Sequence, residues 1–307
     1  IRPIGQQNVR TSKGWGVNKQ PRVAQLRYPT EKHPRGWHQE MQLKNGKKIW
    51  KLTTLSVDDA LHLFLKSQCS LAHAFPSIML GVLQRSIEKS LPQHLQLIGT
   101  VSEVVPDELR ELVRKFPGCR LMDHYGSEES GLMAVQCPLC DAYHPADRSV
   151  NLEILAENGT PAKPGEMGRV VITSLLSYAM PLIRYETGDY AIPAKPGGCR
   201  RSTQTIARII GRESALFKLP NGGKVAVMLP SSDPVLAGIR QFKLFQTSFT
   251  NVEFHYIPCS DDVVLEDSQV QSVVDKYISP HFKVRSVPVS EIPRLPNGKY
   301  LLHECLI

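Results

Sequence analysis

The order of its periodic segments is what most constrains the fold of this chain. Helical patterns alternate with short apolar runs between Ser56 and Tyr125, and such alternation is typical of α/β domains. Ser56 followed by Asp59 predicts a capped helix start. The segments predicted as helices are SVDDALHLFLK (56–66), residues 78–89 and PDELRELVRKF (106–116), and those predicted as buried strands are residues 96–100 and CRLMDHY (119–125).

The pattern changes to strands after residue 150. VNLEILA (150–156) and GRVVIT (168–173) predict a β-hairpin, and PLIRYETGDYAI (181–192) continues in the same style. Beyond about residue 211 the expected order is helix, strand, helix, strand, in residues 233–245, 252–257, 268–278 and 282–287. A small α+β domain is therefore expected to follow a larger α/β part, with the junction near GRES (211–214).

Positive charge is concentrated at the start of the chain. Residues 1–50 hold 11 Lys and Arg against 2 Glu, whereas the remaining residues hold 26 basic and 27 acidic side chains. This first segment also holds all three tryptophans, Trp15, Trp37 and Trp50, but it lacks clear periodicity and is expected to be irregular. Basic residues interleaved with aromatics suit a phosphate backbone, so a nucleic-acid-binding module is one alternative. Because no nucleic-acid-binding motif accompanies them, we favour a solvated basic segment.

Composition favours a cytoplasmic globular protein. No apolar run approaches the roughly 18 residues that a membrane-crossing helix needs, and the first residues contain no apolar signal segment. The seven cysteines are odd in number and the chain is not a short secreted one, so a disulfide framework is not expected. We therefore expect reduced thiols and no membrane partner.

Four short stretches carry the candidate chemistry. They are DHYGSEESG (123–131), RYETGD (184–189), GRESALFK (211–218) and PRLPNGK (293–299). The first gathers three carboxylates where a strand is predicted to end, and the others place an Asp, an Arg and a Lys beside Gly-containing turns. Each stretch alone is also typical of an ordinary solvated turn.

Together, in this order, the four stretches resemble the adenylate-forming superfamily, which includes acyl- and aryl-CoA ligases, luciferases and the adenylation domains of peptide synthetases. The phenylacetate–CoA ligase/CapK-like branch is the most similar, and the resemblance covers about residues 55–307. It implies an α/β (α+β) fold with a large mixed-sheet N-terminal domain and a small mobile α+β lid. The implied division is 1–50 as the remnant of a larger N-terminal subdomain, 51–211 as the adenylation core and 212–307 as the lid.

The resemblance also implies roles for particular residues. Asp123, Tyr125 and Gly126 would frame the adenine and the acyl pocket, and Glu129 would hold Mg²⁺ against the ATP phosphates. Asp189 would bind the ribose hydroxyls.

Two implied roles belong to the lid. Arg212 would contact ribose or phosphate, and Lys299 would reach the substrate carboxylate and the α-phosphate. A carboxylate and ATP repel each other, so Mg²⁺ and Lys299 would offset their charge as pyrophosphate leaves. Rotation about residues 212–214 would then admit the thiol acceptor.

Three departures from the family pattern favour an alternative. Glu128 stands where the family has a phosphate-side hydroxyl, and Ser214 replaces the hinge acid. The Ser/Thr/Gly-rich phosphate loop is not found, TSKGWGVNK (11–19) being the nearest substitute. Either the chain lacks a segment of the native protein, or it is a catalytically reduced relative that binds a nucleotide and an aryl acid.

A cysteine pair predicts a metal site. Cys137, Cys140 and His144 have the spacing of a metal knuckle, although two buried thiols and a surface histidine remain the alternative. Some CapK-like relatives carry cysteines between the TGD and GR motifs, which implies Cys199 as a fourth ligand. Four protein ligands would make such a zinc structural.

The leading hypothesis is an AMP-producing acid–thiol ligase. It would activate an aryl or acyl carboxylic acid with ATP and Mg²⁺ and pass the acyl group to coenzyme A or the thiol of a carrier protein.

Overall fold

The computed structural model describes residues 22–27, 29, 32–42, 48–54, 56–91, 94–137, 140–195, 205–230, 233–260, 262–292 and 301–307. The chain divides into two compact units, residues 1–211 and 212–307. No helix among these described ranges is long and apolar enough to cross a membrane.

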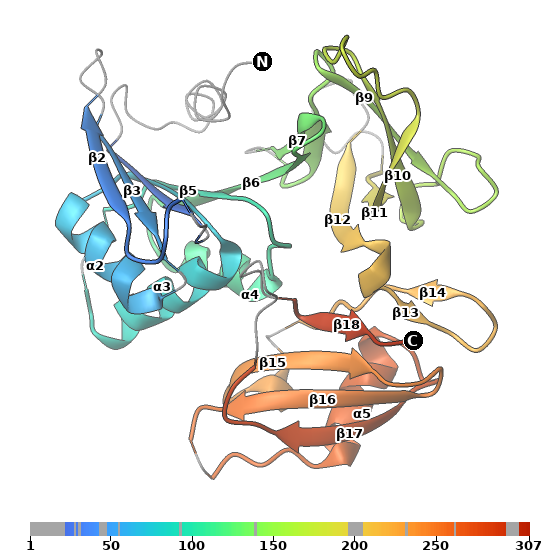
Figure 1. The fold of residues 1–307 in the computed structure, drawn as a ribbon. Coiled ribbons are helices and arrows are strands. Elements are labelled where there is room, and N and C mark those ends of the chain that lie inside the picture. The colour runs from blue at the N-terminus through green and yellow to red at the C-terminus, as the bar shows by residue number, and fades with distance from the viewer. Residues whose placement is uncertain are drawn as a thin grey trace. The chain divides into compact units, whose positions relative to one another are not determined.

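A large mixed sheet organises the first unit (Figure 1). Its strand order is β2-β3-β1-β4-β5-β6-β7-β8-β12-β11-β10-β9. The first six strands are β1 (Val23–Arg27), β2 (His38–Gln42), β3 (Lys48–Thr53), β4 (Leu71–Ala74), β5 (Leu97–Thr100) and β6 (Arg120–Ser127). The others are β7 (Gly131–Gln136), β8 (Tyr143–Pro145), β9 (Val150–Leu155), β10 (Gly168–Ser174), β11 (Tyr185–Pro193) and β12 (Ile206–Arg212).

The parallel part of this sheet carries the helices. Strands β3, β1, β4, β5 and β6 run parallel, and α2 (Val57–Ser67), α3 (Pro76–Glu88) and α4 (Asp107–Arg114) connect successive strands. As predicted, Ser56 caps α2, because its hydroxyl accepts a bond from the Asp59 amide at 3.3 Å. The helices bury Phe64, Ile78 and Leu109 together with inward-facing strand residues in one apolar core.

The remaining strands of the sheet are antiparallel. Strands β9 and β10 pair with Val150 opposite Ser174 at one end and Leu155 opposite Arg169 at the other, which confirms the predicted hairpin. Buried side chains of the antiparallel strands form a second core, which includes Val150, Ile154 and Val170.

The second unit is a small α+β fold. Its four-stranded sheet has the order β17-β16-β15-β18, and α5 (Asp267–Tyr277) packs on it over a core that includes Phe254 and Phe282. The strands are β15 (Ile239–Gln246), β16 (Asn251–Pro258), β17 (Lys283–Pro288) and β18 (His303–Cys305). Shorter elements precede them: η1 (Glu213–Ala215), β13 (Phe217–Lys218), β14 (Lys224–Val225) and η2 (Pro234–Leu236).

Two secondary-structure predictions are wrong. The helix predicted over 233–245 is one 3₁₀ turn, η2, followed by strand β15, because Gly238 adopts a φ of +86° and IRQFKLFQ pairs along β16. The segment expected to be irregular, 1–50, contains β1, β2 and the start of β3, since VAQLR and KIWKLT pair in parallel.

Candidate functional site

The acidic motif lies where β6 leaves the parallel sheet, as its sequence predicts. Strand β6 ends at Ser127, and Glu128 and Glu129 follow in an exposed turn before β7. The turn is closed by Ser127 and Ser130, whose hydroxyl oxygens lie 2.9 Å apart. The two carboxylates thus stand at the carboxyl end of a strand, the edge at which open α/β sheets bind ligands.

Gly126 permits the turn back into β7. A Cβ atom at this position would overlap the carbonyl oxygen of Gly131 on the returning strand. Any side chain here would push the two strands apart, so the motif requires a glycine.

Two motifs that are 64 residues apart meet at one hydrogen bond. The Tyr125 hydroxyl, from β6, donates to Asp189 Oδ2, from β11, at 2.7 Å. Asp189 is further fixed because its amide donates to Thr187 Oγ1 at 3.1 Å, and that hydroxyl donates to the Val170 carbonyl. The expectation that Asp189 follows a turn is wrong: the TGD sequence lies inside β11, where Gly188 has a φ of +75° and the register with β10 shifts.

Asp123 is at the centre of a buried hydrogen-bond network. Thr100 Oγ1 and the Tyr143 hydroxyl each donate to its carboxylate at 2.6 Å. Its amide donates to Gln136 Oε1 at 3.1 Å, and Arg110 donates to the Tyr143 hydroxyl at 3.0 Å. Burial raises the pKa of Asp123, while the bonds from Thr100 and Tyr143 oppose that shift.

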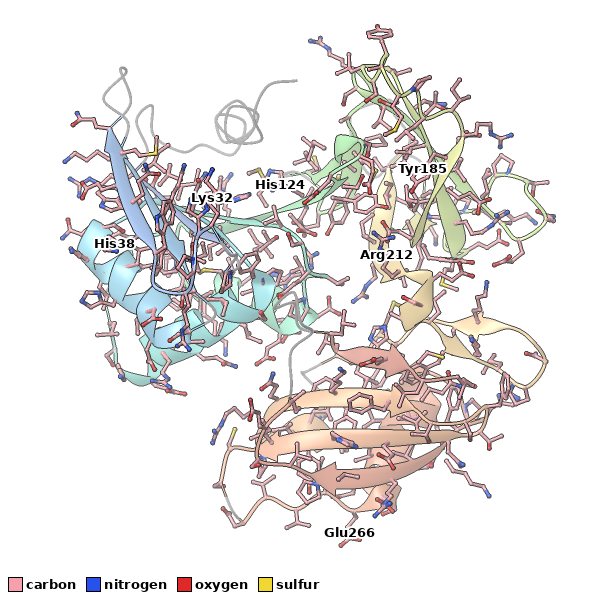
Figure 2. The ribbon with its side chains drawn as sticks, in the orientation of Figure 1. Lys32, His38, His124, Tyr185, Arg212 and Glu266 are labelled. Carbon is pink, nitrogen blue, oxygen red and sulfur yellow. The ribbon has the colours of Figure 1, made fainter. Side chains whose placement is uncertain are left out.

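His124, which Figure 2 labels, follows Asp123 on β6 and therefore has its side chain on the opposite face of the strand. Its Nδ1 lies 3.3 Å from the Thr100 carbonyl oxygen, so this nitrogen carries the proton. Burial lowers the pKa of His124 to about 4, and the ring is therefore neutral at physiological pH.

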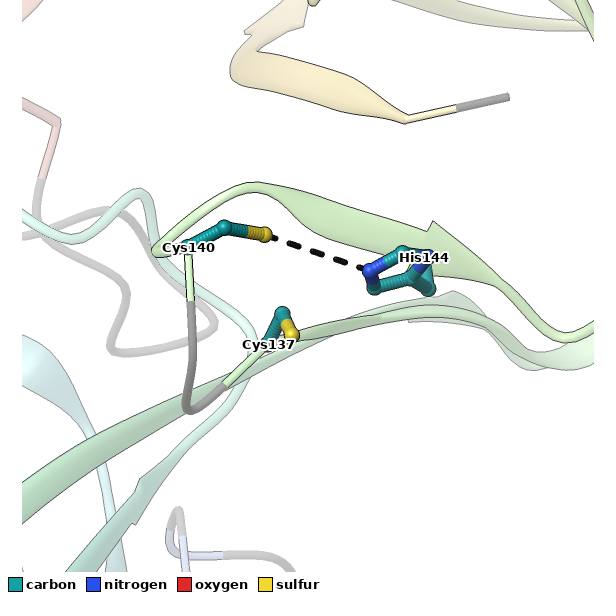
Figure 3. A group of neighbouring side chains, drawn as sticks. All are labelled: Cys137, Cys140 and His144. Carbon is teal, nitrogen blue, oxygen red and sulfur yellow. Dashed lines mark hydrogen bonds between the residues drawn. The ribbon is translucent and has the colours of Figure 1, made fainter. Parts of the chain in front are cut away.

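The structure brings three of the four predicted metal ligands together (Figure 3). The ligand atoms of Cys137, Cys140 and His144 all lie within 4.8 Å of one another. Cys140 Sγ and His144 Nε2 are 4.0 Å apart, and a tetrahedral zinc with ordinary bond lengths would hold them about 3.6 Å apart. The donor set and its spacing therefore fit a zinc ion.

A tight backbone turn shapes this cluster. The Cys137 amide donates to the Ala142 carbonyl at 2.7 Å, and the Asp141 amide donates back to the Cys137 carbonyl at 3.2 Å. Asp141 adopts a φ of +57°, which reverses the chain and returns it as strand β8.

Three further residues are predicted to belong to the site. Arg212 is the exposed first residue of the second unit and stands at the N-cap position of η1, without a capping bond from its side chain. Lys299 and Cys199 lie outside the described residues, as does the segment 11–19.

Sequence reasoning missed the partners of Asp123. Thr100, Arg110, Gln136 and Tyr143 belong to four different elements, and no local motif marks them. The only available signal was the position of Tyr143 beside the predicted ligand His144.

The chain has the fold of the adenylate-forming ligases, as the order of the motifs predicts. Three solved structures carry this comparison. A 2-hydroxyisobutyryl-CoA ligase in complex with R3-HIB-AMP matches with a TM-score of 0.73 and 14% identity over 98% of this chain and 68% of its own. An anthranilate CoA ligase in complex with anthranoyl-AMP matches with a TM-score of 0.65 and 14% identity over 95% of this chain and 61% of its own.

The third is the O-succinylbenzoate coenzyme A synthetase from Bacillus subtilis in complex with AMP, with a TM-score of 0.62 and 13% identity over 96% of this chain and 63% of its own. The chain thus spans about two thirds of the length of these structures. No protein-family model matches the sequence, and no curated protein matches it.

Proposed function

We propose that the protein activates a small aryl or acyl carboxylic acid with ATP. A carboxylate oxygen would attack the α-phosphorus, the bond to the pyrophosphate oxygen would break, and an acyl-adenylate would form. The thiol of coenzyme A would then attack the acyl carbon and release AMP. The Tyr125–Asp189 bond carries this proposal, because it joins the YG and TGD motifs, which we propose form the wall of the nucleotide site (the nucleotide wall). Solved structures with the same fold hold AMP or acyl-AMP.

The residues of the first unit would bind the nucleotide. Asp189 offers a carboxylate to the ribose hydroxyls, and Tyr125 and Gly126 form the adjoining wall. Glu129 suits a hard cation, since its carboxylate is exposed at the strand end. Mg²⁺ bound there would offset the phosphate charge. Asp123 would support the position of Tyr125 and Gly126 without contacting the nucleotide directly, because Thr100 and Tyr143 already donate to both of its carboxylate oxygens.

The second unit would supply the mobile part of the site. Arg212 would contact ribose or phosphate, and Lys299 would neutralise charge at the α-phosphate. We keep the proposed division into 1–50, 51–211 and 212–307, with the last segment as a lid. The CapK-like branch, a carrier protein as alternative acceptor and a cytoplasmic location remain proposals from the sequence.

We further propose that Cys137, Cys140 and His144 hold a structural zinc. Their donor types and spacing support it, and Cys199 is the proposed fourth ligand. A zinc with four protein ligands has no open position, so it would act on the fold and not on the reaction.

Pyrophosphate exchange tests the proposed reaction. With ATP, Mg²⁺ and a panel of aryl and acyl acids, at least one acid should drive exchange of labelled pyrophosphate into ATP. Lys299→Ala should strongly reduce the rate of exchange, while the affinity of the first unit for AMP should stay unchanged. If no acid supports exchange and AMP does not bind, the proposal is wrong.

A further inference from the structure

The metal knuckle, which is made of Cys137, Cys140 and His144, is flanked by two residues that contact Asp123. Gln136 immediately precedes Cys137, and its Oε1 accepts a bond from the Asp123 amide at 3.1 Å. Tyr143 immediately precedes His144, and its hydroxyl donates to Asp123 Oδ2 at 2.6 Å. Both ends of the knuckle are therefore anchored to the same buried residue of β6.

Strand pairing holds these two anchors in one register. Gln136 of β7 is paired with Tyr143 of β8, and Val135 is paired with His144. Strand β8 is only three residues long, and on its other side Tyr143 pairs with Ile206 of β12. The bond from the Cys137 amide to the Ala142 carbonyl continues this pairing into the turn, and a metal bound there would brace the same turn.

The anchors matter because Asp123 is buried. It is 6% exposed, and a buried carboxylate that loses a hydrogen-bond partner is costly. Arg110 of α4 reinforces the arrangement, since it donates to the Tyr143 hydroxyl at 3.0 Å. If Tyr143 shifted, β6 would have to adjust around Asp123.

The same strand reaches the nucleotide wall two residues later. Tyr125 follows Asp123 on β6 with its side chain on the same face, and it holds Asp189 at 2.7 Å. A displacement of Asp123 would therefore shift the strand that carries Tyr125.

We propose that a metal in the knuckle sets the nucleotide affinity of the protein through Tyr143, which acts as a positioning residue for Asp123 and β6. The inference rests on the proposed nucleotide site for its functional consequence. The knuckle is then a support of the nucleotide wall, and AMP binding and metal binding favour each other.

A cycle of metal removal and mutation tests the coupling. Wild type and Tyr143→Phe are each studied with zinc and after chelation, by calorimetric titration with AMP and by hydrogen exchange of the Asp123 and His124 amides. In the wild type, chelation should weaken AMP binding about tenfold and speed exchange of both amides. Zinc-loaded Tyr143→Phe should already show both changes, and chelation should add little, because the coupling path is broken.

Two further variants serve as a control and as a milder perturbation. Tyr277→Phe removes a hydroxyl that donates to Asp233 at 3.1 Å in the second unit, and it should keep the metal dependence of the wild type. Arg110→Met leaves Tyr143 in place but removes its donor, so an intermediate effect is expected even where Tyr143→Phe folds poorly.

The outcomes separate this inference from the proposed function. Independent, additive effects of chelation and Tyr143→Phe on AMP affinity would overturn the coupling. So would hydrogen exchange of the Asp123 and His124 amides at the same rate with and without the metal. If the hydrogen exchange of these amides depends on the metal but the protein binds no AMP, the coupling of the metal to β6 is supported and the proposed nucleotide site is overturned.

Discussion

Tyr125 donates a hydrogen bond to Asp189 at 2.7 Å, although the two residues are 64 positions apart in the chain. One lies on β6, the last parallel strand, and the other on β11 in the antiparallel part of the sheet. The bond therefore ties the two halves of the first unit together at the proposed ribose site. It also orients the Asp189 carboxylate, because one oxygen is held by the phenol.

Removing this phenol should weaken nucleotide binding. In Tyr125→Phe the Asp189 carboxylate loses an ordering donor, and a bond to a charged group of this kind contributes enough to change affinity about five- to tenfold. We expect AMP binding, measured by calorimetry, to weaken by that factor. Tyr178→Phe is the matched control, since Tyr178 is 87% exposed and should leave the affinity unchanged. Equal affinity in wild type and Tyr125→Phe would contradict a role for the pair.

The adjacent acids of the turn should differ in function. Glu128 and Glu129 are both exposed, so substitution of either should alter stability little. Glu129→Gln should raise the Mg²⁺ concentration needed for half-maximal pyrophosphate exchange, because an amide binds a hard cation more weakly than a carboxylate. Glu128→Gln, next to it, should keep the Mg²⁺ requirement of the wild type. The reverse result would assign the metal to Glu128.

The sequence was sufficient for those features that depend on neighbouring residues. The Ser56 cap, the amphipathic helix over 106–116 and the hairpin from 150 to 173 each have local signals, and the structure confirms them. The order of the motifs also predicted the fold, through the resemblance to the adenylate-forming superfamily.

Features that depend on distant pairing were not predictable in this way. Thr-Gly-Asp is typical of a turn, yet Gly188 uses its positive φ inside a bulged strand. The helix predicted over 233–245 failed because pairing of Ile239–Gln246 with β16 outweighs helical spacing. The partners of Asp123 come from strands and a helix that meet only after folding.

His124 should make stability depend on pH. Its pKa is lowered to about 4 in the folded protein and is about 6.5 in an unfolded chain, so only the unfolded state binds a proton between these values. This residue therefore lowers the free energy of unfolding as the pH falls below about 6.5, by about 2 kcal/mol between pH 7 and pH 5. Urea unfolding, followed by the fluorescence of Trp37 and Trp50, should show this loss.

Substitution isolates the contribution of this one ring. His124→Gln should lose less stability than the wild type between pH 7 and pH 5, because glutamine does not titrate. His62→Gln, which changes an exposed histidine on α2, should retain the pH dependence of the wild type. Identical pH dependence in wild type and His124→Gln would show that folding does not lower the pKa of His124.

Metal analysis should find about one zinc per chain, held by thiolates. Cobalt substituted for zinc should give the absorption of cobalt–thiolate bonds, and Cys140→Ser should reduce both that absorption and the metal affinity, since a hydroxyl is a poor zinc ligand. Cys259→Ser is the control, because Cys259 is exposed in the second unit and should leave the metal site intact. Cys199→Ser tests the fourth position: a loss of affinity like that of Cys140→Ser supports ligation by Cys199, whereas unchanged cobalt absorption assigns the position to another ligand.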